Sequence, residues 1–310
     1  MEKRLQEDQD SCYEVLNSMF PGKMPRCGVT LSLGRSTLKV VKRLGKGGYG
    51  VVFKVCEIDA SVDGVDVDLA MKVQASCAWD MFISREIEHR TRGKQRQWFC
   101  CCQRGVQYVD KGVTIMPRGG QTLQYLLNAY NRRGKHMHEL TAMAFTIELL
   151  KIVECLHQHD ILHLDIKLDN LLLREQHHHP LQGLLIIDFG RSIDLRLLPP
   201  KCVFEGNSEW CTAPLGVQTW CYEPDRYSVA CAAHFLLWGT MLPFDTRTSV
   251  PTTTVRMKRY WQSSLWQPVF AELLTSPGPV NAAIRQPLEA HLASKTDLLV
   301  SEMAQHKWMI

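Results

Sequence analysis

Several features that mark common protein classes are missing from this sequence of 310 residues. Its twelve cysteines contain no Cys-x-x-Cys pair, and three of them are adjacent at 100–102. Neither a zinc knuckle nor a disulfide framework is therefore predicted, and reduced thiols, as found in the cytosol or nucleus, are expected. The formal net charge is only +4 and no block of like charges occurs, so the composition predicts no direct nucleic-acid binding.

Long apolar runs are also missing. Acidic residues lie at the start of the chain, where a cleavable signal peptide would need an apolar stretch, so no such peptide is expected. The two most apolar helix-like stretches, 142–156 and 228–242, are interrupted by charged residues or histidine. No membrane span and no membrane partner is predicted. With 45% hydrophobic residues, the chain can still bury a substantial core.

The most informative segment of the chain reads Asp165-Ile166-Lys167-Leu168-Asp169-Asn170. Eighteen residues after Asn170 comes Asp188, which is followed by Phe189 and Gly190. Phosphoryl transfer from a nucleotide needs a carboxylate that orients the acceptor hydroxyl, a cation beside the phosphoryl group, and oxygen ligands for Mg²⁺. Asp165, Lys167 and the pair Asn170 and Asp188 supply these three parts. Each residue alone is equally typical of a solvated loop, and the order of the whole set favours the chemistry.

A glycine-rich loop precedes this segment, with the sequence Gly45-Lys46-Gly47-Gly48-Tyr49-Gly50. Glycines let the backbone approach nucleotide phosphates without a Cβ in the way. The same spacing opens dinucleotide-binding units, but there a helix follows, whereas here the β-rich run 51–55 predicts a strand. A second apolar strand is predicted over 69–73. It carries Lys72, whose burial favours a phosphate contact over a solvated position.

Taken in order, these motifs resemble those of protein kinases over about residues 42–240. The resemblance implies an α+β, bilobal fold with a small β-rich N-lobe and a larger helical C-lobe. It also implies ATP and Mg²⁺ as cofactors. The domains expected are an N-terminal extension over 1–38, the N-lobe over 39–116 and the C-lobe over 117–310.

The kinase resemblance also assigns roles residue by residue. Asp165, Lys167 and Lys72 are expected to act in catalysis, and Asn170 and Asp188 to bind the metal. The expected nucleotide contacts are Gly45, Lys46, Gly47, Gly50, Val52, Ala70, Lys72 and Asp80.

Helical spacing of apolar residues predicts helices over 123–130 and 141–157, and the stretch 114–120 is expected to contain a hinge. A short helix is also predicted over 12–20, with Tyr13, Leu16 and Phe20 on one side.

Shorter stretches resemble the Bub family of mitotic spindle-checkpoint kinases. They are 72–74, 78–83, 122–123, 161–170 and 185–195. This resemblance implies a serine/threonine kinase with a protein substrate such as a core histone, with spindle-checkpoint partners, and with a location in the nucleus and cytoplasm or at the kinetochore. It points to Asp80 as the acid beside Lys72, whereas the usual pattern of a small-lobe helix points to Glu86. We favour Asp80.

Two departures from the kinase pattern affect regulation. Leu164 stands where many kinases carry the arginine that pairs with a phosphorylated activation loop, so activation by loop phosphorylation is not expected. No Ala-Pro-Glu closes the activation segment, where Glu209 and Glu223 are the nearby acids. Its tryptophans and cysteines are expected to pack against the large lobe, namely Trp210, Cys211, Trp220 and Cys221.

Two other functions are compatible with these departures. A pseudokinase scaffold would keep the fold without the chemistry, but the full set of nucleotide, metal and acceptor residues favours an enzyme. A small-molecule phosphotransferase is the second. Lys167 and the long segment between Gly190 and Asp225 favour a peptide acceptor instead.

Three further features have structural interpretations. The run 177–179 is three histidines that could bind a metal, although a solvated loop is favoured. Asp225 is predicted to be a buried acid that holds the catalytic-loop backbone, with a surface N-cap as the alternative. His163 is expected to support the loop rather than to react.

Overall fold

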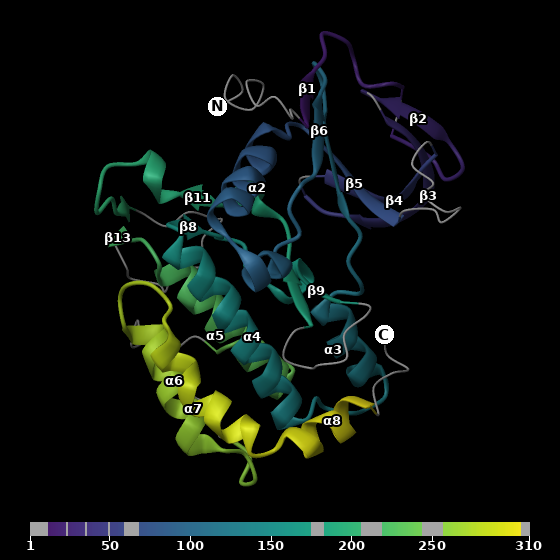
Figure 1. The fold of residues 1–310 in the computed structure, drawn as a ribbon. Coiled ribbons are helices and arrows are strands. Elements are labelled where there is room, and N and C mark those ends of the chain that lie inside the picture. Colours follow the sequence, from purple (N-terminus) through teal and green to yellow (C-terminus); the bar gives the residue numbers. More distant parts are fainter. Residues whose placement is uncertain are drawn as a thin grey trace. The chain divides into compact units, whose positions relative to one another are not determined.

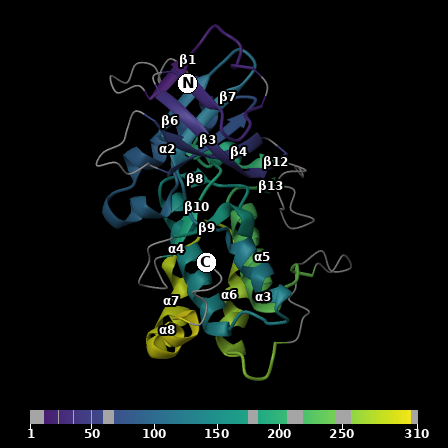
Figure 2. The same ribbon diagram turned by 90° about the vertical axis from the view of Figure 1, so that its right-hand side faces the viewer.

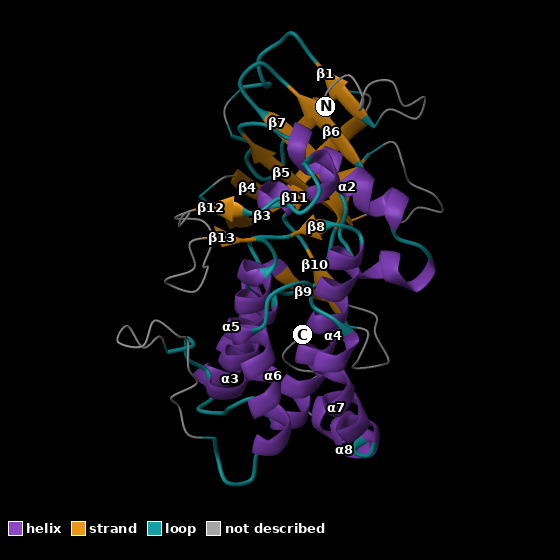
Figure 3. Cartoon of the chain, turned by 90° about the vertical axis from the view of Figure 1, so that its left-hand side faces the viewer, coloured by secondary structure: helices purple, strands orange, loops and turns teal. Residues whose placement is uncertain are grey.

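The computed structural model describes residues 12–22, 24–34, 36–48, 50–58, 68–174, 183–205, 219–243 and 257–304. The chain divides into two compact units. The sheet unit comprises Met1–Arg92 and Phe99–Arg118, and the helical unit comprises Gly93–Trp98 and Gly119–Ile310. Figure 3 shows the difference in content, since strands dominate the first unit and helices the second.

The sheet unit is built on seven strands in the order β1-β6-β7-β5-β4-β3-β2 (Figure 1; β7 is labelled in Figure 2). The strands are β1 (Tyr13–Val15), β2 (Thr30–Leu33), β3 (Ser36–Lys46), β4 (Gly50–Glu57), β5 (Asp68–Gln74), β6 (Arg104–Gln107) and β7 (Gly112–Pro117). Alternate residues of β3, Leu38 and Val40, are fully buried and join the core with Val55 of β4. The predicted strands over 51–55 and 69–73 are therefore confirmed.

The predicted helix over 12–20 is wrong, because Tyr13–Val15 forms the edge strand β1. This strand pairs in parallel with β6, with Tyr13 opposite Gly105. Tyr13 is buried, and a Cβ on Gly105 would lie only 3.1 Å from its ring. Pairing with a distant strand thus overrides the local helical spacing of apolar residues.

One helix of the sheet unit is described, α2 (Ala78–Arg90). It contacts β6 and β7. Its buried side includes Met81, Phe82 and Ile83, and it also buries the carboxylate-bearing Asp80. Burial of this acid requires a partner, which the sheet provides as described below.

The helical unit contains α3 (Leu123–Arg132), α4 (Glu139–Gln158), α5 (Glu223–Trp238), α6 (Ser263–Thr275), α7 (Ala282–Ala293) and α8 (Thr296–Ala304). Figure 2 shows α4, α5, α6 and α7 in this unit, and α4 contacts both α5 and α7. Nearly every residue of α4 is buried, which is typical of a central core helix. The predicted helices over 123–130 and 141–157 are confirmed by α3 and α4.

Short 3₁₀ helices and strands complete the helical unit. They are the 3₁₀ helices η1 (Gly93–Trp98), η2 (Leu168–Asn170), η4 (Phe189–Arg191) and η5 (Leu195–Leu197), and the strands β8 (Ile161–Leu162), β9 (Leu171–Leu173), β10 (Leu184–Ile186), β11 (Ile193–Asp194), β12 (Phe204–Glu205) and β13 (Thr219–Trp220). The strands pair antiparallel as β9 with β10, β8 with β11, and β12 with β13. These pairings bring the segments around 165 and 188 together.

Within the described ranges, no helix is long and apolar enough to cross a membrane. The cysteines of these residues are free thiols, and no cluster of three or more histidine, cysteine or acidic side chains is arranged to hold a metal there.

Candidate active site

A catalytic-loop cluster in the helical unit consists of Asp165, Lys167, Asn170 and Arg191, whose side chains converge on one carboxylate. Asp165 Oδ2 lies 2.7 Å from Lys167 Nζ and accepts a hydrogen bond of 2.9 Å from Asn170 Nδ2. Asp165 Oδ1 contacts Arg191 Nη1 at the longer distance of 3.3 Å. The carboxylate is therefore oriented mainly through Oδ2, and Oδ1 carries the weaker contact.

Asn170 connects the side chain of Asp165 to the loop backbone. Its Nδ2 donates a second hydrogen bond, of 2.8 Å, to the main-chain carbonyl of Asp165. Because the amide nitrogen is directed at Asp165, the amide oxygen Oδ1 points away from that carboxylate. This oxygen is the atom that a hard cation would bind.

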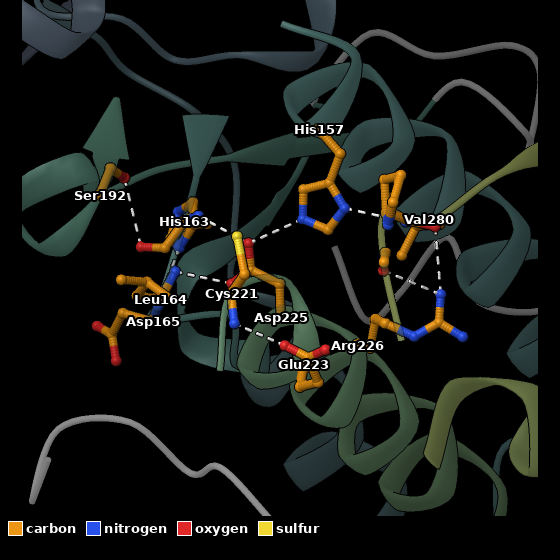
Figure 4. A network of polar contacts seen from close by, with 12 residues as sticks. His157, His163, Leu164, Asp165, Ser192, Cys221, Glu223, Asp225, Arg226 and Val280 are labelled. Carbon is orange, nitrogen blue, oxygen red and sulfur yellow. Dashed lines mark hydrogen bonds and ion pairs between the residues drawn. The ribbon is translucent and has the colours of Figure 1, made fainter. Parts of the chain in front are cut away.

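Asp225 of α5 holds the backbone just before the catalytic residues (Figure 4). Its carboxylate is fully buried and accepts hydrogen bonds from the main-chain nitrogens of His163, at 2.7 Å, and Leu164, at 2.8 Å. His157 Nε2 lies 3.1 Å from Asp225 Oδ2. The predicted role of Asp225 is confirmed, and the N-cap alternative is wrong because Tyr222 is the N-cap residue of α5.

The ionisation of Asp225 follows from these contacts. Burial opposes the charged form, but the hydrogen bonds from His157 and from the backbone of His163 outweigh it and hold the pKa of Asp225 below its ordinary value. His157 Nδ1 accepts a hydrogen bond of 3.0 Å from Val280 N, so Nε2 is the nitrogen that carries the proton toward Asp225. In this arrangement the two ring nitrogens of His157 make hydrogen bonds to Val280 and to Asp225.

His163 supports the loop as predicted. Its Nδ1 accepts a hydrogen bond of 3.2 Å from Asp165 N, so Nε2 carries the proton and donates it to the Ile187 carbonyl at 3.1 Å. Burial lowers the pKa of His163, which keeps the ring neutral near pH 7. The ring also meets Phe189 edge-on, with 5.3 Å between centroids. His163 thus joins the catalytic loop to the segment that carries Asp188.

Asp188 lies directly after Ile187 and has a left-handed backbone, with φ 69° and ψ 73°. Its side chain is half-buried. A carboxylate and an amide oxygen, from Asp188 and Asn170, form a donor set that fits Mg²⁺, which keeps waters and substrate phosphates as its other ligands. Such a set does not require an all-protein metal cage.

The sheet unit contains a buried ion pair. Lys72 of β5 has its Nζ 3.6 Å from Asp80 Oδ2 on α2, and both residues are buried. Asp80 Oδ2 also accepts a hydrogen bond from Gln74 Nε2. The other acid considered for this lysine, Glu86, lies 2.5 Å from Arg90 Nη2 on the same helix.

The glycine loop lies in the hairpin of β3 and β4, with Gly45 opposite Val52. Gly45, Lys46 and Gly47 are exposed, and a Cβ on Gly45 or Gly47 would meet no atom of the described residues within 4 Å, apart from its chain neighbours. At Gly50, in contrast, a Cβ would lie 2.7 Å from the Val73 carbonyl oxygen. Packing within the protein therefore requires glycine at position 50, whereas the space around Gly45 and Gly47 is open.

Two further nucleotide-site predictions fall on the neighbouring strands. Val52 of β4 lies opposite Lys72, and Ala70 of β5 lies opposite Met116 of β7. Ala70 is buried and Val52 is half-buried. The two units meet in sequence at Arg118 and Gly119, within the stretch expected to contain a hinge.

The described parts of the activation segment are held by contacts with the rest of the helical unit and with one another. Ser192 Oγ donates to the His163 carbonyl at 3.3 Å, and β11 pairs with β8. Trp220 is buried and stacks on Phe204, with centroids 4.6 Å apart, and Cys221 is half-buried. Leu164, which replaces the usual arginine, has a left-handed backbone with φ 61°.

Some predictions lie outside the described residues, namely those for the histidines 177–179 and for Glu209, Trp210 and Cys211. Sequence reasoning also missed some contacts. It assigned no role to Arg191, to His157 or to Gln74. Their only sequence signal was proximity to a motif, since Arg191 follows Asp-Phe-Gly and Gln74 lies two residues after Lys72.

Comparison with known proteins agrees with this geometry. Residues 38–308 match the family described as Protein kinase domain. The chain is 30% identical over 295 residues to the mitotic checkpoint serine/threonine-protein kinase BUB1 of Arabidopsis thaliana, covering 84% of this chain and 55% of that protein. It is 27% identical over 284 residues to the spindle assembly checkpoint kinase BUB1 of Saccharomyces cerevisiae, covering 80% of this chain and 27% of that one.

A solved structure, that of the BubR1 kinase domain, aligns with a TM-score of 0.87 at 23% identity, covering 99% of this chain and 94% of the other. This likeness confirms the predicted α+β fold with a β-rich N-lobe and a helical C-lobe. The chain spans about half the length of the plant relative and about a quarter of the yeast one. With most of its length matched, the chain belongs to the protein kinase family and is similar to the BUB1 mitotic checkpoint kinases.

Proposed function

We propose that the chain is an active serine/threonine kinase that transfers the γ-phosphoryl group of Mg-ATP to a protein hydroxyl. The arrangement around Asp165 carries this proposal. Its Oδ2 is occupied by Lys167 and Asn170, which leaves Oδ1, with its longer contact to Arg191, as the oxygen that takes the hydrogen bond of the acceptor hydroxyl. Lys167 is exposed at 50% of its side chain, so its ammonium can also stabilise charge on the transferring group.

The fit of the cofactor is supported by two observations. The exposed glycines of the β3–β4 hairpin have space where their side chains would be, and a phosphate that approaches the backbone needs such space. Lys72 lies on the adjacent β5 and is oriented by Asp80. In this proposal Lys72 contacts the nucleotide phosphates, and Asn170 and Asp188 hold Mg²⁺, which neutralises the charge of the phosphates.

The similarity to BUB1 kinases extends the proposal to the cell. We infer a role in mitotic spindle-checkpoint signalling, at the kinetochore or chromosome and in the nucleus and cytoplasm, with checkpoint proteins as partners. A core histone is the substrate proposed on the same similarity. Both inferences depend on relatives of which this chain spans only part.

The proposal is tested with the full chain, radiolabelled ATP and Mg²⁺, using a histone mixture and a generic basic protein as acceptors. We expect label on serine or threonine, and no label when the metal is chelated. Label on a small hydroxyl compound alone would indicate a small-molecule phosphotransferase. Nucleotide binding without transfer to any acceptor would indicate a pseudokinase scaffold and would contradict the proposal.

A further inference from the structure

A pocket of about 390 Å³ opens beside the catalytic-loop cluster in the helical unit. The polar part of its lining includes Asp165, Lys167 and Arg191. The apolar part of its lining includes Phe235, Met241 and Leu242. Its volume lies within the roughly 300–1,000 Å³ of binding pockets. The pocket is thus continuous with the carboxylate to which we assign the acceptor hydroxyl.

One face of α5 forms the floor of this pocket. The residues involved follow helical spacing along that face, and they are Tyr227, Ser228, Cys231, Ala232 and Phe235. None of them carries a charge at neutral pH. A cationic side chain placed against these five residues would lose water without gaining an acid from α5, whereas the burial of an apolar side chain there is favourable.

The charged groups of the pocket lie around the catalytic loop. Lys167 and Arg191 both contact Asp165. Among the described residues that line the pocket, Asp169 is the other acid, and it is exposed to solvent. The polar part of the lining is therefore suited to a hydroxyl group and a peptide backbone. The part contributed by α5 is suited to an apolar side chain.

The apolar part of the lining that follows α5 depends on how this helix ends. Gly239 adopts φ 72°, which ends the helix, and its N–H bonds to the Phe235 carbonyl at 2.8 Å. His234 Nδ1 then lies 2.9 Å from the Thr240 carbonyl oxygen, so the ring donates a hydrogen bond that fixes the following turn. These bonds position Met241 next to the pocket although 71% of its surface is exposed. An exposed methionine on a pocket wall is typical of an adaptable binding surface.

We propose that this pocket binds an apolar side chain of the protein substrate, close in sequence to the accepting serine or threonine. The inference rests on the proposed kinase function and adds a substrate class to it. The occupant is an extended peptide whose hydroxyl lies at Asp165 and whose neighbouring leucine, methionine or phenylalanine enters between the catalytic loop and α5. Lysine or arginine at that peptide position is disfavoured.

The test uses the full chain and a set of peptides with one central serine, in which each flanking position in turn carries Leu, Met, Phe, Ala, Lys or Glu. At one position we expect kcat/KM for the apolar residues to exceed that for Ala and Lys by about tenfold or more, as hydrophobic pockets discriminate by roughly 10–200-fold. Equal rates at every scanned position, or a preference for Lys at the apolar position, would overturn the assignment.

Two matched substitutions locate the preference. Met241→Glu puts an acid on the pocket wall at an exposed position, so folding is preserved; we expect the apolar preference to fall to about threefold or less and Lys to be accepted better. Leu298→Glu makes the same change at a leucine of α8 that is 48% exposed, and we expect its profile to match the wild type. Identical profiles for the two variants would contradict the pocket.

Binding measurements separate this inference from the proposed function. The same peptides with alanine in place of the serine are labelled, and their binding to the chain is followed by fluorescence anisotropy. One outcome is that no peptide is phosphorylated, but the peptides with an apolar residue bind and Met241→Glu weakens their binding. In that case the kinase proposal fails and the pocket assignment stands. If transfer is efficient without any residue preference, the pocket assignment fails and the kinase proposal stands.

Discussion

The catalytic loop and the glycine loop are held by the protein in opposite ways. Main-chain nitrogens of His163 and Leu164 donate to the fully buried Asp225, so the catalytic loop is fixed from the interior. Gly45 and Gly47 of the glycine loop are exposed, and in the part of the chain that the structure describes only their chain neighbours lie within 4 Å of a Cβ built on them. The first is therefore preorganised for chemistry, and the second leaves space for a ligand.

This difference separates two kinds of substitution. A substitution at Asp225, which holds the catalytic loop, is expected to lower both the stability of the protein and the transfer rate. The same hydrogen bonds stabilise the fold and position the catalytic residues. A change in the open part of the glycine loop is expected to alter nucleotide affinity alone. The predictions below test this separation, from the largest expected effect to the smallest.

Asp225→Ala should have the largest effect. It leaves three buried donors without an acceptor, each costing about 1–3 kcal/mol, so we expect a loss of at least about 3 kcal/mol in unfolding free energy. The transfer rate should fall about a hundredfold or more because the backbone of Asp165 is no longer held. Urea denaturation and a transfer assay measure the two effects. Asp297→Ala, at an exposed position of α8, is the control. Equal stability of the two variants would contradict the conclusion that Asp225 fixes the catalytic loop from the interior.

Glu148 of α4 gives a pH test of the same interior. The residue is fully buried, and its Oε2 accepts a hydrogen bond of 2.9 Å from Gly183 N, just before β10. Burial raises the pKa of Glu148 from 4.5 to about 7. The folded state therefore binds more protons than the unfolded state between these values, and its stability falls as the pH rises through them, by about 3 kcal/mol in total.

Glu148→Gln stays neutral and should remove this loss. We expect it to be more stable than the wild type by up to about 3 kcal/mol above pH 7, and equal to it below about pH 4.5. Glu205→Gln, at an exposed position of β12, is the control and should follow the wild type. Parallel stability curves for wild type and Glu148→Gln from pH 5 to 8 would show that Glu148 is ionised throughout.

A pair of glycine substitutions sharpens the comparison within the glycine loop. At Gly50 a Cβ would lie 2.7 Å from the backbone oxygen of Val73, which cannot move aside, so Gly50→Ala should cost about 1–3 kcal/mol in unfolding free energy. Gly47→Ala should change stability by less than about 0.5 kcal/mol and should weaken ATP binding instead. Thermal unfolding and calorimetric titration with ATP separate the two outcomes, and equal destabilisation would refute the open-loop interpretation.

Dephosphorylation should have the smallest effect. The start of the activation segment is tied to the catalytic loop by Ser192 and by the pairing of β11 with β8, neither of which needs a phosphate. We expect phosphatase-treated protein to keep its transfer rate within about twofold, well below the tenfold that 1.4 kcal/mol of lost ordering would cause. A tenfold loss restored by autophosphorylation would show that another cation replaces the arginine missing at Leu164.

Much of this architecture could be predicted from local sequence. The strand with Lys72 and the helices over 123–130 and 141–157 have periodic apolar residues, and the buried role of Asp225 follows from the apolar helix around it. The segment 12–20 was assigned wrongly because its conformation depends on pairing with β6, about ninety residues away.

The site could be predicted in residue identity but not in its connections. Arg191 reaches Asp165 across 26 positions, and His157 reaches Asp225 across 68. No periodicity encodes such contacts, because they arise only when α4, α5 and the two loops pack together. The pocket beside the catalytic loop was missed for the same reason, since its walls combine that loop with the turn after Gly239.

The most direct test of the central claim compares the wild type with Asp165→Asn in two measurements, calorimetric binding of Mg-ATP and single-turnover transfer to an accepted protein. The account predicts equal nucleotide affinity and a transfer rate lower by two or more orders of magnitude in Asp165→Asn, about 3 kcal/mol of barrier. Equal transfer by both proteins, or binding without transfer by both, would contradict it.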